Sequence, residues 1–172
     1  MTELPERELL VLRHAKSAWD AGIGSDFERS LAPRGRRDAP RMGAWLAQHG
    51  LLPDYVVCSP AVRAAETATL VLNAMGLEGQ PSHWDQRIYG AGARELIELL
   101  AEVPADSKRA LLIGHNPGLE VLVRSLAKSL KGHEGGKFFP TCALAHLGMP
   151  ADWRDLPDGC AALLDLARPK EI

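Results

Sequence analysis

Residues 9–14, Leu-Leu-Val-Leu-Arg-His, decide the fold, because four consecutive apolar residues are followed directly by a guanidinium and an imidazole. An apolar run without alternation predicts a strand that is buried on both faces, as in a parallel sheet covered by helices. Side chains just beyond the carboxyl end of such a strand open into the crevice where α/β proteins bind ligands. Arg13 and His14 are therefore candidate site residues. This stretch alone leaves open that they are merely polar residues at a strand end.

A second apolar run, residues 55–58 (Tyr-Val-Val-Cys), is followed by Ser59-Pro60. That dipeptide is typical of a helix N-cap with proline at the first helical position. The pattern after it predicts a helix over residues 62–75 with Arg63 in its first turn. The helix macrodipole disfavours a cation there, and a bound anion would relieve the penalty. Arg63 is therefore a candidate anion ligand, and an arginine that reaches into solvent is the alternative.

A third apolar run, residues 110–113 (Ala-Leu-Leu-Ile), stops at Gly114-His115 before another helical pattern. A single histidine is most often structural, but this is the second histidine to follow a predicted buried strand. The carboxyl ends of parallel strands meet at one edge of a sheet. We therefore expect His115 to lie close to Arg13, His14 and Arg63.

The rest of the chain alternates helical and strand patterns. A helix is expected before Gly50, beginning near Pro40 or kinked there, and another over residues 93–103. Further strands are expected within residues 80–89, 141–147 and 160–166. This alternation predicts a three-layer α/β fold, with a mostly parallel central sheet flanked by helices, in a single domain of residues 1–172.

Composition narrows the classes of partner and compartment. The net charge of -2 gives no global positive field, so we expect no nucleic-acid partner. No apolar run approaches a membrane span, and the apolar run near the start is too short for a signal peptide, so we expect a cytoplasmic protein. The three cysteines, Cys58, Cys142 and Cys160, lack zinc-site or redox spacing and are expected to be reduced.

Arginines cluster at Arg29, Arg34, Arg36 and Arg37, at the predicted entrance to the helix before Gly50. Such a run is usually a solvated face, and it can also attract an acidic partner. The sequence leaves both roles open.

Two arginines and two histidines together suit phosphoryl transfer. Guanidinium groups stabilise charge on the phosphoryl oxygens, one histidine can donate a hydrogen bond, and the other can attack phosphorus. This chemistry requires no metal ion and no other cofactor.

The motifs also resemble a known family. Arg13-His14-Ala15-Lys16-Ser17, then Ser59-Pro60 with Arg63, then Gly114-His115-Asn116, resemble in that order the histidine phosphatase superfamily, over about residues 9–166. The short length and the segments at residues 31–35 and 138–141 are most similar to bacterial phosphohistidine phosphatases of the SixA type.

The resemblance implies a phosphoglycerate mutase-like fold and a role for each site residue. It makes His14 the phosphorylated nucleophile, and Arg13, Arg63 and His115 the phosphate ligands. Asp20 stands where relatives often have an asparagine that contacts phosphate. Ala15 replaces the usual glycine after the nucleophile, as is common in this branch.

The superfamily usually has an acidic residue that protonates the leaving oxygen. Asp85 is the only carboxylate in residues 83–90, and we take it as a candidate general acid. A phosphoramidate needs a dedicated acid less than an alkyl phosphate does, because its nitrogen can be protonated before cleavage. The expected partner is therefore a protein that carries phosphohistidine, such as a phosphocarrier or phosphotransfer domain, and a small phosphate ester is the alternative.

Other classes remain as competing hypotheses. A generic phosphomonoesterase of the same superfamily and a non-catalytic phosphate- or phosphoprotein-binding module both fit the arginines. A phosphoglycerate mutase would need extra segments for which the chain has little room. A metal site at His14, His115 and Asp20 would place a cation beside two arginines. A cysteine phosphatase fails on spacing, because only four residues separate Cys58 from Arg63.

Overall fold

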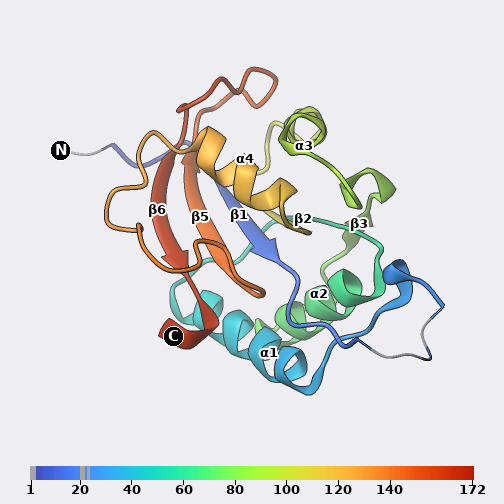
Figure 1. The fold of residues 1–172 in the computed structure, drawn as a ribbon. Helices are drawn as coiled ribbons and strands as arrows, with labels where there is room; N and C mark the ends of the chain where they lie inside the picture. Colours follow the sequence, from blue (N-terminus) through green and yellow to red (C-terminus); the bar gives the residue numbers. More distant parts are fainter. Residues whose placement is uncertain (1–2, 20–21, 23) are drawn as a thin grey trace.

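The computed structural model describes residues 3–19, 22 and 24–172, and its centre is one six-stranded sheet (Figure 1). The strands lie in the order β3-β2-β4-β1-β5-β6. Their bounds are β1 Arg7–Arg13, β2 Tyr55–Cys58, β3 Ser82–Trp84, β4 Arg109–Gly114, β5 Leu144–Met149 and β6 Ala162–Ala167. The helices are α1 Pro33–Gln48, α2 Val62–Ala74, α3 Ala93–Leu100 and α4 Gly118–Leu126, with short 3-10 turns η1 Asp26–Glu28, η2 Gln86–Ile88 and η3 Pro169–Glu171.

The sheet is mostly parallel, as predicted. β4 pairs in parallel with both β1 and β2, and β3 pairs in parallel with β2. β5 runs antiparallel to β1 and to β6. The carboxyl ends of β1, β2 and β4 therefore meet at the same edge of the sheet, where the candidate site residues follow.

Helices cover both faces of the sheet, so the fold has the three layers expected from the sequence, helices, sheet and helices (Figure 1). In β1, Leu9 and Val11 pack in the core under α3 and α4, whereas Leu10 and Leu12 pack in the core under α1 and α2. All four side chains are fully buried, as the unbroken apolar run predicts. Within the described ranges, no helix combines the length and apolar character needed to cross a membrane.

Several element boundaries differ from the sequence prediction. α1 begins at Pro33 and contains Pro40 in its interior, because its buried face packs in the core and outweighs the local cost of a proline. α2 begins at Val62, where the helical pattern places its start, and not at Pro60, the first helical position that Ser59-Pro60 indicates. α3 ends at Leu100, before residue 103. β5 begins at Leu144 rather than at residue 141, since Cys142 has a positive φ of 62° that no extended strand allows.

The start of α1 packs tightly against the chain that follows β1. The Ala32 N–H donates to the Lys16 oxygen at 2.8 Å. A Cβ at Gly35 would lie 2.2 Å from that same Lys16 oxygen. Because this contact is with backbone, the glycine is required for the close approach. The contact fixes the segment directly after His14.

We expect Gly35→Ala to lower the free energy of unfolding by about 1 to 3 kcal/mol, because overpacking a rigid contact outweighs the better helix propensity of alanine. Urea denaturation measures the change. Gly79→Ala is the matched control, since a Cβ there meets nothing within 4 Å, and it should change stability by less than about 0.5 kcal/mol. Equal effects of the two substitutions would contradict the role given to Gly35.

Candidate active site

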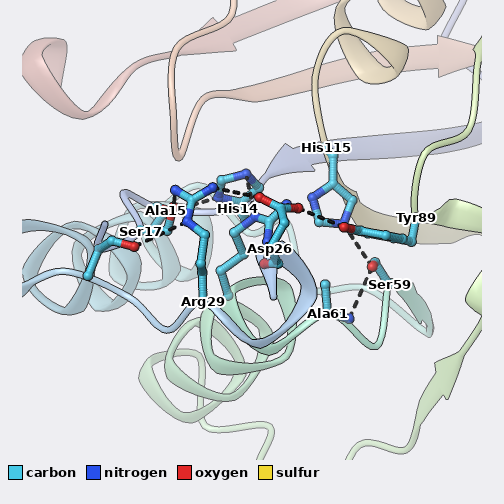
Figure 2. Close-up of polar contacts among 11 residues, drawn as sticks. His14, Ala15, Ser17, Asp26, Arg29, Ser59, Ala61, Tyr89 and His115 are labelled. Atoms are coloured by element: carbon cyan, nitrogen blue, oxygen red, sulfur yellow. Dashed lines mark hydrogen bonds and ion pairs between the residues drawn. The ribbon is translucent and has the colours of Figure 1, made fainter. Parts of the chain in front are cut away.

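Parallel pairing of β1 with β4 brings the two strand-end histidines together. Arg13 lies opposite Gly114 in the register, and the His14 N–H donates to the Gly114 oxygen at 3.0 Å. The ring centroids of His14 and His115 are consequently 5.2 Å apart (Figure 2). Arg63 reaches the same place from the first turn of α2. The structure therefore brings together Arg13, His14, Arg63 and His115.

Hydrogen bonding selects one tautomer of His14. Its Nδ1 lies 2.7 Å from the Ala15 carbonyl oxygen, which can only accept, so Nδ1 carries the proton. Nε2 is then the nitrogen with the lone pair. The Arg63 Nε–H points at this Nε2 from 3.4 Å. His14 thus presents an unprotonated ring nitrogen next to a guanidinium.

Both imidazoles are neutral near pH 7. Burial above all lowers the pKa of His14 to about 3, together with the nearby His115, Arg63 and Arg13 and against the hydrogen bond to Ala15. Burial lowers the pKa of His115 to about 4, together with the charges of Arg63 and Arg13 and against that of Asp26. A neutral histidine is the form that can attack phosphorus.

Thr67, one turn after Arg63 in α2, links the segment that follows His14 to the helix. The Ala15 N–H donates to Thr67 Oγ1 at 3.0 Å, and that hydroxyl donates to the Arg63 oxygen at 2.7 Å. The sequence analysis did not single out Thr67. The i, i+4 spacing from Arg63 places it on the same helix face, but no local signal shows that it meets Ala15.

Ser59 contacts the site rather than capping α2. Its Oγ lies 2.8 Å from His115 Nε2 and accepts a hydrogen bond from the Ala61 N–H at 3.2 Å. The edge of Tyr89 packs against the His115 ring, with centroids 5.4 Å apart (Figure 2). The ring of His115 is therefore held from two sides.

Two buried side-chain nitrogens lack a hydrogen-bond partner among the residues that the structure describes: Arg13 Nε and His115 Nδ1. Arg13 Nη1 is occupied, since it donates to the Phe139 oxygen at 3.1 Å. Buried polar groups in folded proteins almost always have a partner, and an unpaired one calls for an explanation such as a bound ion or a catalytic role. The guanidinium Nε is always a donor. An oxyanion next to His14 would satisfy it.

Asp26 in η1 is a central site residue that the sequence analysis missed. Its main-chain oxygen accepts from Arg63 Nη1 at 2.7 Å, and its Oδ2 accepts from Arg63 Nη2 at 3.0 Å and from the Tyr89 hydroxyl at 2.7 Å. Arg29 Nη1 donates to Oδ1 at 2.8 Å. These donors, Tyr89 first and then Arg29, hold the pKa of Asp26 far below its usual range.

In this arrangement the nitrogens of the Arg63 guanidinium have different partners. Asp26 takes both terminal nitrogens, and Nε remains directed at His14 (Figure 2 shows Asp26 between His14 and Tyr89). No local sequence pattern joins residue 26 to residue 63 or 89, so only the fold reveals the cluster.

Of the two carboxylates predicted from the sequence, the structure describes only Asp85. Asp20 lies outside the described residues. Asp85 accepts from Arg87 Nη2 at 2.7 Å, and Arg87 also donates to Glu102 at 2.6 Å. The hydrogen bond from Arg87 lowers the pKa of Asp85. A carboxyl that binds its proton so weakly is a poor general acid, which argues against the role considered for Asp85.

The geometry also bears on the competing cysteine and metal hypotheses. Cys58 is buried, and burial raises the pKa of its thiol well above the usual range, so it is not a thiolate nucleophile. Next to His14 and His115, the charges of Arg13 and Arg63 oppose a bound cation.

Comparisons with known proteins indicate one superfamily. A family model described as the histidine phosphatase superfamily (branch 1) matches residues 9–88. An uncharacterized protein of Mycobacterium tuberculosis is 36% identical over 165 residues, which cover 92% of this chain and 100% of the relative.

Two solved structures are similar over nearly their whole length. A candidate phosphohistidine phosphatase SixA from Agrobacterium tumefaciens is 26% identical with a TM-score of 0.80, covering 97% of this chain and 100% of that one. One from Nakamurella multipartitia is 30% identical with a TM-score of 0.76, covering 95% and 96%.

The low pKa values predict how the two imidazoles titrate. Because His14 and His115 have pKa values lowered to about 3 and about 4, both rings should remain neutral from pH 8 down to about pH 5. NMR of the ring nitrogens in the ligand-free protein measures this, with signals assigned by their loss in His14→Asn and His115→Asn. A midpoint near 6.5, the ordinary histidine value, for either ring would show that burial and the arginines do not control its charge.

Proposed function

This chain belongs to the histidine phosphatase superfamily and is a phosphatase, and we propose that its substrate is phosphohistidine on a protein. The observation that carries the proposal is the neutral Nε2 of His14, which lies among arginines. Beside it, Arg13 Nε and His115 Nδ1 find no hydrogen-bond partner within the described part of the chain. The similarity to structures described as candidate SixA phosphohistidine phosphatases supports the choice of substrate.

The first step is attack by His14. Nε2 bonds to the phosphorus of the substrate, and the bond between phosphorus and the substrate imidazole breaks. The electron pair of that bond stays on the leaving nitrogen, and the substrate imidazole leaves as a neutral ring because its other nitrogen already carries a proton. Water then attacks phosphorus on His14, which releases inorganic phosphate and restores neutral His14. Arg13 Nε donates to a phosphoryl oxygen, and His115 Nδ1 does so in the tautomer in which Ser59 Oγ donates to Nε2; these preorganised donors stabilise charge in the transition state.

Arg63 serves the phosphoryl group through Nε, the nitrogen that Asp26 leaves unoccupied. Asp26 acts through Arg63: it holds the guanidinium plane, and Tyr89 and Arg29 hold Asp26. A charged carboxylate this close also opposes a second anion. The site therefore suits one phosphoryl group attached to a neutral leaving group better than a polyphosphorylated substrate.

The acid requirement favours phosphohistidine over an alkyl phosphate. Asp26 and Asp85 both have lowered pKa values, so neither holds a proton at neutral pH to give to an alkoxide. A phosphorylated imidazole takes a proton from water at the ring nitrogen that does not carry phosphorus, before the bond between nitrogen and phosphorus breaks. The reaction then needs no dedicated acid from the protein.

We expect kcat/KM for a phosphohistidine peptide to exceed that for phenyl phosphate by at least about tenfold, because only the ester demands a strong acid for its leaving group. Both rates are measured by phosphate release in the presence of a chelator, with His14→Ala as the inactive control.

Each other outcome selects a competing hypothesis. Faster turnover of phenyl phosphate, lost in Asp85→Asn, would make the protein a generic phosphomonoesterase. Binding of phosphate without turnover of either substrate would make it a binding module. Turnover abolished by the chelator would require a metal mechanism.

A further inference from the structure

A second, strongly basic cavity lies outside the phosphate site. It has a volume of about 590 Å³ and lies between the start of α1, residues 135–141 and the C-terminal turn η3, which Figure 1 shows beside α1. Two carboxylates, Asp38 and Glu171, face six cationic side chains: Arg34, Arg37, Arg41, Lys137, Arg168 and Lys170. We call this cavity the basic cleft.

The charges of the basic cleft are only partly neutralised. Asp38 is 6% exposed and is shared by three guanidinium groups, those of Arg34 at 3.9 Å, Arg37 at 4.0 Å and Arg41 at 3.4 Å. Across the cleft, Arg168 pairs with Glu171 at 3.2 Å. Among the described residues, Lys137 and Lys170 come within 4.0 Å of no carboxylate. The cleft therefore keeps an excess of positive charge in a chain whose net charge is -2.

The cations of α1 form a row. Arg34, Arg37 and Arg41 have the spacing i, i+3, i+7, which places them on one helix face over about 10 Å. Their side chains are 50%, 67% and 44% exposed. A row of exposed guanidinium groups fits an extended acidic segment better than a compact anion, which would need its ligands to converge on one point.

One chain segment borders both the basic cleft and the phosphate site. Pro140 and Thr141 line the cleft, and Arg34 Nη2 donates to Thr141 Oγ1 at 3.4 Å. Phe139, the residue before them, accepts a hydrogen bond from Arg13 at its main-chain oxygen. Cys142, the residue after them, donates its N–H to the His14 oxygen at 3.0 Å. The basic cleft and the phosphate site are therefore linked by residues 139–142.

We propose that the basic cleft docks acidic residues that flank the phosphohistidine of a protein substrate. The proposal rests on the proposed function, because the basic cleft would select which phosphohistidine protein binds, a choice that the phosphate site alone does not make. Surface charge of this kind raises the encounter rate and fixes orientation.

Two arginines of the sequence cluster do not line the basic cleft. Of the arginine-rich stretch singled out in the sequence, Arg29 turns to Asp26 and Arg36 approaches Glu66 at 3.8 Å. The docking row instead continues along α1 to Arg41.

The test uses synthetic peptides of about ten residues, about 30 Å when extended, with one phosphohistidine flanked by glutamates or by lysines. The protein should hydrolyse the glutamate peptide with a kcat/KM about tenfold higher at low salt, and the preference should fade at about 0.5 M salt. Arg37→Glu/Lys170→Glu, which reverses one charge on each wall of the cleft, should abolish the preference and leave hydrolysis of the small phosphoramidate ion unchanged.

The matched control is Arg94→Glu/Arg154→Glu, which makes the same change in net charge at side chains 91% and 81% exposed outside the cleft; it should keep the preference. If both variants lose the preference for the glutamate peptide, the effect comes from net charge. If neither variant loses it, the basic cleft does not dock the peptide. Either result overturns the proposal.

A separate binding measurement distinguishes failure of docking from failure of the proposed function. Fluorescence anisotropy with the unphosphorylated glutamate peptide should show binding that the cleft variant loses, even if no phosphohistidine is hydrolysed. Absence of such binding together with normal phosphohistidine turnover would reject docking alone. Tight binding of inorganic tripolyphosphate that leaves peptide binding and turnover unaffected would show that the basic cleft is a site for a small anion and not for a peptide.

Discussion

The parallel register of β1 with β4 is the constraint on which the rest of the site depends. Arg13 lies opposite Gly114, so the residues directly after them, His14 and His115, enter the same crevice. A slip of one residue would exchange the two faces of β1 and move Leu9 and Val11 into the opposite core. Both faces of the strand are buried, so core packing on either side opposes such a slip. The catalytic geometry is therefore secured by the hydrophobic core.

Burial and positive charge together define the chemistry of this crevice. Two histidines that would otherwise titrate near neutrality are kept uncharged by burial and by arginines, and the carbonyl of Ala15 turns the reactive nitrogen toward the phosphate position. Asp26 is the anion that balances Arg63 in the described structure. The same fold places more positive charge around α1 and η3, which is where we propose that an acidic protein substrate is recognised.

The sequence predicted what depends on short patterns. Unbroken apolar runs predicted β1 and β4, and the polar residues that follow these runs predicted His14 and His115 as site residues. It could not predict what depends on distant contacts: Asp26 meets Arg63 and Tyr89 across 37 and 63 residues, and Ser59 turns to His115 instead of capping α2. Pro40 left open whether α1 begins near it or is kinked there; α1 begins at Pro33, because tertiary packing outweighs the local cost of a proline inside the helix.

The central claim is that His14 Nε2 carries the phosphoryl group between the two halves of the reaction, and trapping that intermediate tests it most directly. Rapid quenching after mixing with ³²P-labelled phosphohistidine peptide should give a protein-bound label that is acid-labile and alkali-stable and that maps to the peptide containing His14. His115→Ala should still form it, more slowly, and His14→Ala should not. Label retained in His14→Ala and lost in His115→Ala would show that the two histidines have the opposite roles.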